Sequence, residues 1–137
     1  MTHRTRSFFD LVTKLARKHP HDHHFHLASI IVRRNTVISV GFNSRKTHPK
    51  TNTPFRNLHS EADCILGVDQ RYLEGSSMFV ARVGFNNRNK VLMSQPCEYC
   101  QAIIFGSGLR DCYFTIDESS IGYWDIRNNI WDTIKVA

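Results

Sequence analysis

Two short segments of the chain combine residue types that bind a soft divalent metal ion. The first is His59-Ser60-Glu61, and the second is Pro96-Cys97-Glu98-Tyr99-Cys100. A neutral imidazole and two thiolates suit zinc, which is usually held by four tetrahedral ligands. If one histidine and two cysteines fill three positions, the fourth is open to water, as in catalytic zinc sites. The pattern therefore predicts one catalytic Zn2+ ion per chain, held by His59, Cys97 and Cys100.

Glu61 supplies the group that such a site needs for proton transfer. Zinc lowers the pKa of its bound water to about 7, and a carboxylate two residues from His59 can accept the proton of that water. C-x-x-C alone also occurs in redox motifs and zinc fingers, and H-x-E alone carries little information. Together and in this order, H-x-E and P-C-x-x-C form the signature of the zinc-dependent nucleobase deaminases.

The chain has two further cysteines, Cys64 and Cys112, and each lies in an apolar setting. We expect both to be buried, reduced thiols rather than a disulfide. An alternative makes Cys64 a fourth zinc ligand, which would close the site and make it structural. That alternative is disfavoured, because a closed site needs no carboxylate beside the metal.

Length and composition predict a single globular domain that spans residues 1–137. The 137 residues are 41% hydrophobic and 22% charged, which is ordinary for a globular protein. No apolar run approaches the length of about 20 residues that spans a membrane, and the N-terminus lacks the features of a signal peptide. We therefore expect a cytoplasmic protein without a membrane partner. The formal charge of +6 favours anionic partners, namely nucleotides or single-stranded nucleic acid.

Hydrophobic periodicity predicts elements that bring the two metal-binding segments together. Helices are expected at 4–19, at 58–67 and from Pro96 onward. Strands are expected at 27–33, 36–42, 78–83 and 109–116. The first two strands form a hairpin, in which Asn35 suits a positive φ. The last two are joined through a helix and should pair in parallel. The tail, 123–137, is left open between one strand, two strands and a helix.

Two polar segments lie between these elements. The first is rich in histidine and is expected to be a solvated loop rather than a metal site; it contains His19, His21, His23, His24 and His26. The second, 44–57, is basic and directly precedes the H-x-E motif. Its cations could grip a substrate phosphate, or the segment could simply be a solvated loop. The cations proposed for this phosphate contact are Lys46, His48 and Arg56.

Residues 27–117 resemble the cytidine and deoxycytidylate deaminase superfamily. The likeness is carried by the two zinc-binding motifs and by the flanking segments GFNSRKTHP (41–49) and MSQPCEYCQ (93–101). It is strongest to the CMP/dCMP-type branch, which includes small bacterial and bacteriophage deaminases. Free-cytidine deaminases usually carry cysteine where this chain has His59, which points away from that branch.

The resemblance implies a fold and a set of site residues. The fold is a three-layer α/β/α sandwich around a mixed five-stranded sheet, and the family usually forms dimers or larger homo-oligomers. Glu61 is then the proton shuttle, and Asn43 is the residue that contacts the substrate. Ser60 replaces a commoner alanine whose backbone N–H meets the base carbonyl, and Ser94 lines the pocket.

The function predicted from these observations is hydrolytic deamination of a small-molecule cytosine nucleotide, most simply dCMP to dUMP with release of ammonia. One alternative is a deaminase of cytosine or adenosine in single-stranded DNA, RNA or tRNA, which the net charge would also serve. A second alternative is a non-catalytic zinc module that binds nucleic acid or a partner protein. The presence of Glu61 argues against the second alternative.

Overall fold

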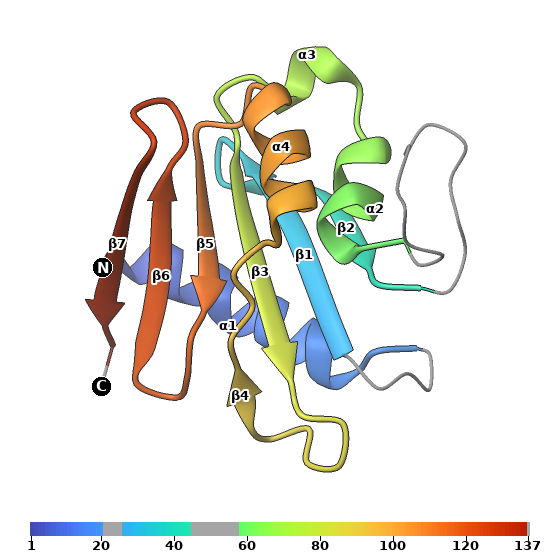
Figure 1. Cartoon of the computed structure of the whole chain (residues 1–137), viewed down its shortest axis with the longest axis vertical. Helices are drawn as coiled ribbons and strands as arrows, with labels where there is room; N and C mark the ends of the chain where they lie inside the picture. The colour runs from blue at the N-terminus through green and yellow to red at the C-terminus, as the bar shows by residue number, and fades with distance from the viewer. Residues whose placement is uncertain (21–25, 45–57, 137) are drawn as a thin grey trace.

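The computed structural model describes residues 1–20, 26–44 and 58–136, and it forms one mixed sheet with helices on both faces (Figure 1). The helices are α1 (His3–Arg17), α2 (Ser60–Leu66), α3 (Gln70–Leu73) and α4 (Glu98–Gly106). The strands are β1 (His26–Arg33), β2 (Thr36–Phe42), β3 (Ser77–Val83), β4 (Val91–Leu92), β5 (Asp111–Thr115), β6 (Ser120–Asp125) and β7 (Ile130–Lys135).

The sheet has the order β2-β1-β3-β5-β6-β7, and β4 pairs with β3 beside this path. The pairing of β3 with β5 is parallel, as predicted from the helical crossover, and the other pairings are antiparallel. The predicted mixed α/β fold is confirmed, but the expected count of five strands is wrong, because the described residues alone form a sheet of seven. Beyond the four strands that the sequence places, the sheet contains the short β4 and the antiparallel pair β6–β7, which the tail forms.

Side-chain alternation along β3 divides the core into two layers. Phe79, Ala81 and Val83 pack in one hydrophobic cluster with Phe9 and Val12 of α1. Met78 and Val80 belong to the other cluster, which includes Cys64 of α2 and Ile104 of α4. Figure 1 shows α1 behind the sheet and α2 and α4 in front of it. The predicted three-layer arrangement is therefore present.

The β1–β2 hairpin turns where the sequence predicts it. Arg34 and Asn35 have φ values of 50° and 65°, and two successive positive φ values match the right-handed twist of the strands they connect. At its other end β2 passes very close to α2. A β-carbon on Gly41 would collide with the carbonyl oxygen of Ser60 and would lie 2.5 Å from the backbone nitrogen of Cys64. Glycine at position 41 therefore sets the spacing between β2 and α2.

Two details differ from the sequence-based expectations. Helix α4 begins at Glu98 with Cys97 as its N-cap, so Pro96 precedes the cap and is not the first helical residue. The solvated loop predicted for the histidine-rich segment is wrong at its two ends, because His19 and His26 are buried. His21, His23 and His24 lie outside the described residues.

Among the described residues, no helix is both long and apolar enough to cross a membrane.

Candidate metal centre

The predicted zinc ligands meet where the N-termini of two helices converge. His59 is the N-cap of α2, Cys97 is the N-cap of α4, and Cys100 lies in the first turn of α4. The Nδ1 atom of His59 is 3.6 Å from Sγ of Cys97 and 3.3 Å from Sγ of Cys100. All three potential ligand atoms lie within 4.8 Å of one another. Segments nearly 40 residues apart in sequence thus present one imidazole and two thiols to a common point.

These separations fit a tetrahedral zinc ion. Bond lengths of about 2.3 Å to sulfur and 2.0–2.1 Å to nitrogen place tetrahedral sulfur and nitrogen ligands about 3.6 Å apart. The two measured separations, 3.6 Å and 3.3 Å, are close to this value. Cys64, the alternative fourth ligand, is instead fully buried in the core below α2, where its thiol faces the carbonyl oxygen of Ser29 at 3.5 Å. Both Cys64 and Cys112 are buried free thiols, as predicted.

Burial of Cys100 favours the protonated thiol over the thiolate in the metal-free site. Burial raises the pKa of the Cys100 thiol well above 9.0, and the negative charges of Glu61 and Cys97 raise it further. The helix N-terminus, which favours a thiolate, is outweighed by desolvation at this residue. Cys100 is therefore protonated near neutral pH until a cation replaces its proton.

Glu61 is held from behind by a chain of two hydroxyl groups. Ser60 Oγ donates a hydrogen bond of 2.7 Å to Oε1 of Glu61, and Ser29 Oγ on β1 lies 2.8 Å from Ser60 Oγ. Ser29, Ser60 and Glu61 are each at most 4% exposed. The hydroxyl of Ser60 is thus directed at the carboxylate of Glu61. The contact with the carbonyl group of the substrate base, which the family resemblance implies for residue 60, therefore falls to the backbone N–H of Ser60.

A hollow of about 410 Å³ opens over the metal-binding residues. This volume is within the range of about 300–1,000 Å³ typical of small-molecule sites. Its lining consists of Leu27, Asn43, Leu58, His59, Ser60, Glu61, Arg82, Met93, Ser94, Gln95 and Cys97. All of the predicted site residues that the structure describes therefore lie at this hollow, except Cys100, which is buried beneath it.

Asn43 and Ser94 line the hollow, but their side chains are also part of its frame. The amide oxygen of Asn43 accepts a hydrogen bond of 3.0 Å from the backbone N–H of Leu27, and Nε2 of His19 lies 2.7 Å away. The hydroxyl of Ser94 accepts hydrogen bonds from the backbone N–H and the hydroxyl of Thr115, at 2.7 Å and 2.8 Å. His19, for which the sequence predicts a solvated loop, therefore contacts and orients Asn43.

Arg82 is a lining residue that the sequence analysis did not single out. It lies in β3 after Met78 and Val80, and alternation places all three side chains on the face that carries α2 and α4. The signal was present in the sequence, because an arginine interrupts the apolar pattern of this strand. The predicted phosphate-binding cations, Lys46, His48 and Arg56, lie outside the described residues.

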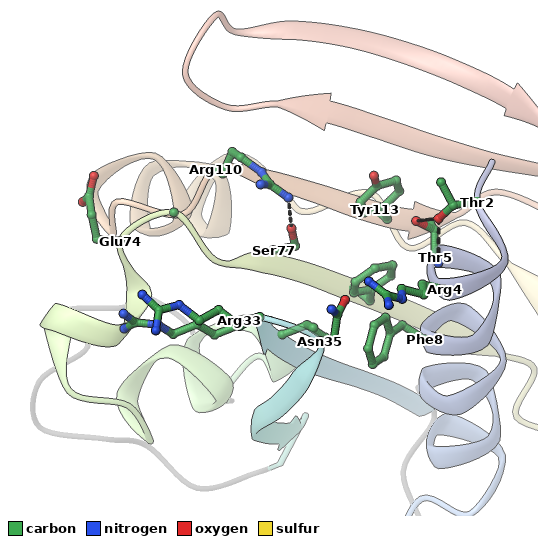
Figure 2. A pocket seen from close by; sticks show the side chains of 14 residues that line it. Thr2, Arg4, Thr5, Phe8, Arg33, Asn35, Glu74, Ser77, Arg110 and Tyr113 are labelled. Carbon is green, nitrogen blue, oxygen red and sulfur yellow. Dashed lines mark hydrogen bonds between the residues drawn. The ribbon is translucent and has the colours of Figure 1, made fainter.

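A larger hollow lies elsewhere among the described residues. It measures about 570 Å³ and is lined by the start of α1 and by the turn after β1, together with residues such as Ser77 and Arg110 (Figure 2). Arg110 donates a hydrogen bond of 3.1 Å to Ser77 there. The lining includes none of the metal-binding residues, so volume alone does not locate the chemistry. The candidate site is therefore the smaller hollow, where the predicted zinc ligands and the carboxylate of Glu61 lie.

A family comparison agrees with this assignment. Residues 2–116 match the model of the cytidine and deoxycytidylate deaminase zinc-binding region. The chain belongs to this deaminase family. The match includes both zinc-binding motifs and the whole of the sheet except β6 and β7. Among curated proteins, none matches the chain.

Solved structures of deaminases share the fold. The dCMP deaminase of the cyanophage S-TIM5 in its apo form has a TM-score of 0.60 at 19% identity, over 85% of this chain and 86% of that chain. The same enzyme in complex with dCMP and dUMP has a TM-score of 0.61 at 17% identity, over 83% and 82% of the two chains.

A larger enzyme contains the same fold as one part. The diaminohydroxyphosphoribosylaminopyrimidine deaminase/5-amino-6-(5-phosphoribosylamino)uracil reductase of Thermotoga maritima has a TM-score of 0.54 at 20% identity. The similarity covers 85% of this deaminase but only 31% of that chain. At these identities the structures establish a common architecture and leave the substrate to be argued from the site.

Proposed function

We propose that this deaminase converts dCMP to dUMP and ammonia with one zinc ion bound by His59, Cys97 and Cys100. One observation carries the proposal: His59 and Cys97 line a single hollow of about 410 Å³ together with Glu61, and the third predicted ligand, Cys100, lies close to both of them. The cyanophage enzyme of the same fold was crystallised with dCMP and dUMP, which supports a nucleotide of this size and charge.

The proposed reaction replaces the exocyclic amine of cytosine with oxygen. A zinc ion, when bound, would supply a water molecule acidified to a pKa of about 7. Glu61 accepts a proton from this water as the oxygen forms its bond to C4 of the base. Glu61 delivers this proton to N3, accepts a second proton from the hydroxyl group now on C4, and passes that one to the amine. The C4–N bond then breaks, and ammonia leaves. The carboxylate ends the cycle in its starting state, so it acts as a shuttle.

The surrounding residues keep this carboxylate in place and restrict water. Ser60 fixes one oxygen of Glu61 by hydrogen bonding, which leaves the other oxygen for proton transfer. Glu61 is only 4% exposed, so a bound base would separate it from bulk solvent. The framework around Asn43 and Ser94 holds the opposite walls of the hollow in fixed positions.

Ammonia release tests the proposal directly. We would incubate zinc-loaded protein with dCMP, CMP, deoxycytidine, and separately with single-stranded oligonucleotides that contain cytosine or adenine. The Glu61→Gln variant, which should retain zinc, is the control for contaminating deaminases. We expect turnover of dCMP by the wild-type protein alone. Turnover of an oligonucleotide alone would assign the chain to nucleic-acid editing. Zinc binding without turnover of any substrate would favour a non-catalytic module.

A further inference from the structure

We infer that the larger of the two hollows described above binds single-stranded nucleic acid through its phosphodiester backbone. This hollow of about 570 Å³, called here the arginine-lined hollow, is lined by Arg4, Arg33, Arg34 and Arg110. Among the described residues it shares no lining side chain with the hollow over the metal centre. The inference therefore does not depend on the deaminase function proposed above.

The arginine-lined hollow lies on the side of the sheet that carries α1. Phe79 and Tyr113 line it, and both belong to the hydrophobic cluster that includes residues of α1 or pack against that cluster. Helices α2 and α4, which begin at the proposed zinc ligands, cover the other face of the sheet (Figure 1). A strand in this hollow and a nucleotide at the metal centre would thus occupy opposite faces of the protein.

Positive charges converge on this hollow from three parts of the chain (Figure 2). Arg4 lies in the first turn of α1, and Arg110 directly precedes β5. Arg33 is the last residue of β1, and Arg34 follows it in the turn. Glu74 is the one carboxylate among the described lining residues. Like charges gathered in this way repel one another, and an anionic ligand relieves the repulsion.

The carboxylates near the hollow already have cationic partners. Asp111 lies 3.4 Å from Arg110, and Glu74 lies 3.9 Å from Arg127. Three of the lining arginines form no ion pair with a carboxylate in the part of the chain that the structure describes, namely Arg4, Arg33 and Arg34. Their charges are therefore available to an external anion.

The start of α1 adds to the positive potential of the hollow. Its first turn contains Arg4 and Arg6 but no acidic residue, although the N-terminus of a helix carries a partial positive charge that carboxylates stabilise. Thr2 and Thr5 line the hollow beside this turn, and threonine hydroxyls often contact phosphate oxygens. A phosphate here would meet guanidinium groups, hydroxyl groups and the positive end of the helix together.

The kinds of side chain in the lining favour a nucleic-acid strand over an inorganic anion. All four cations are arginines, whose planar guanidinium groups bind phosphate through paired hydrogen bonds and also stack on aromatic rings. Phe8 and Tyr113, both partly exposed, line the same hollow. Aromatic side chains within a cationic groove serve as platforms for unpaired bases. Because pairing would hide the faces of the bases, the ligand assigned is a single strand.

Fluorescence anisotropy with a labelled oligothymidylate of about 12 nucleotides tests the inference. Thymine has no exocyclic amine, so this probe cannot be a substrate of a deaminase. The association constant should fall as salt is added, because each phosphate neutralised contributes about −0.7 to the slope of log K against log salt. The three arginines without a described carboxylate partner should together contribute about −2. Labelled oligouridylate is measured in parallel; binding of either strand supports the site, and the tighter one identifies DNA or RNA as the source.

Two substitutions remove charges from the hollow. Arg4→Gln and Arg34→Gln should each weaken binding about three- to tenfold and reduce the magnitude of the salt slope by about 0.7. The matched control is Lys14→Gln, because Lys14 is an exposed cation of α1 that lines a different hollow. It should leave Kd within about twofold of the wild-type value. Melting temperatures check the folding of each variant, and Arg34→Gln, in an exposed turn, carries the comparison if Arg4→Gln is unstable.

Strand binding and deamination should be separable. The double variant Arg4→Gln/Arg34→Gln should keep the wild-type kcat/KM for dCMP, and Glu61→Gln should bind oligothymidylate as the wild-type protein does. If the wild-type protein deaminates no substrate but binds the strand through these arginines, the strand-binding role stands and the dCMP deaminase function falls.

Four results would overturn the strand-binding role of the arginine-lined hollow. The first is no binding of either strand, or binding that does not depend on salt. The second is an equal loss of affinity in Lys14→Gln and in the arginine variants. The third is equally tight binding of a duplex of the same length. The fourth is displacement of the strand by a stoichiometric amount of thymidine triphosphate, which would indicate a site for a free nucleotide.

Discussion

The hydroxyl of Ser60 donates a hydrogen bond of 2.7 Å to the carboxylate of its sequence neighbour Glu61. Both side chains are almost fully buried, so the bond is not exposed to competing water. Ser60→Ala should lower kcat about tenfold, which corresponds to an increase of about 1.4 kcal/mol in the activation free energy. KM and zinc content should be unchanged. Steady-state kinetics on dCMP and zinc analysis of the same samples check this.

Ser29 provides the control for the same hydrogen-bonded chain, because it reaches Glu61 only through Ser60. Ser29→Ala should reduce kcat by less than Ser60→Ala, and the double variant should be no slower than Ser60→Ala alone. Effects that multiply in the double variant would show that the two hydroxyls act independently.

Glu61→Gln should abolish measurable turnover while leaving zinc bound. Loss of a positioned proton carrier costs about 10²–10⁴ in rate, and the amide keeps the size and part of the hydrogen bonding of the carboxylate. The measurements are ammonia release and zinc stoichiometry. A variant with wild-type activity would remove Glu61 from the mechanism.

Cys97→Ala should lose zinc and melt at a lower temperature in the presence of the metal. Metal binding couples directly to stability when the ligands come from separate elements, and here they come from the starts of α2 and α4. Cys112→Ala is the matched control, because this thiol is fully buried in the core and belongs to no metal-binding group found among the described residues. That variant should lose stability and keep one zinc ion, whereas zinc retention by Cys97→Ala would exclude Cys97 as a ligand.

Zinc uptake should release protons near neutral pH. Since burial raises the pKa of the Cys100 thiol, the metal-free protein carries this proton and must lose it when the thiolate binds the ion. Zinc affinity should therefore rise with pH, and the enthalpy of binding should depend on the ionisation enthalpy of the buffer. Buffer-independent calorimetry would contradict the protonated state of the free site.

Stability should fall at alkaline pH partly through Cys64. Burial raises the pKa of the Cys64 thiol from 9.0 to about 12. Because the pKa is higher in the folded state, the protonated Cys64 thiol contributes to the free energy of unfolding. This contribution is complete below about pH 9 and is lost as pH rises toward 12. Urea unfolding between about pH 9 and pH 12 measures the free energy of unfolding. It should fall more steeply with pH for the wild-type protein than for Cys64→Ala, by about 1 kcal/mol per pH unit. Parallel pH profiles would show that Cys64 does not ionise on unfolding.

The sequence predicted those parts of the fold whose signals are local. The β1–β2 hairpin followed from two apolar, β-branched segments joined by Arg34-Asn35, and the parallel pairing of β3 with β5 followed from the intervening helix. The tail remained undecided because Trp124 and Trp131 fit a helix or a strand equally well in sequence. Their stacking across β6 and β7, with ring centroids 4.4 Å apart, depends on a partner strand that periodicity cannot supply.

The residues of the candidate site likewise fall into those that the sequence predicts and those that it does not. The motif residues His59, Glu61, Cys97 and Cys100 could be named because their spacing is fixed by chemistry. Ser29 and His19 could not be named, because their relation to the site arises only when distant strands are paired. Arg82 could have been noticed as the charged residue in an otherwise apolar strand. His19 illustrates the reason: among several neighbouring histidines, only burial against Asn43 distinguishes it.

The close approach of β2 to α2 has a consequence for how this protein can change. Position 41 has no room for a β-carbon beside Ser60 and Cys64, so even alanine would push α2 outward and carry His59 and Glu61 away from Cys97. In a saturation library at position 41, only the protein with glycine should therefore be active. Directed evolution toward new bases would gain more by diversifying Met93 and Gln95, which line the hollow and have exposed side chains.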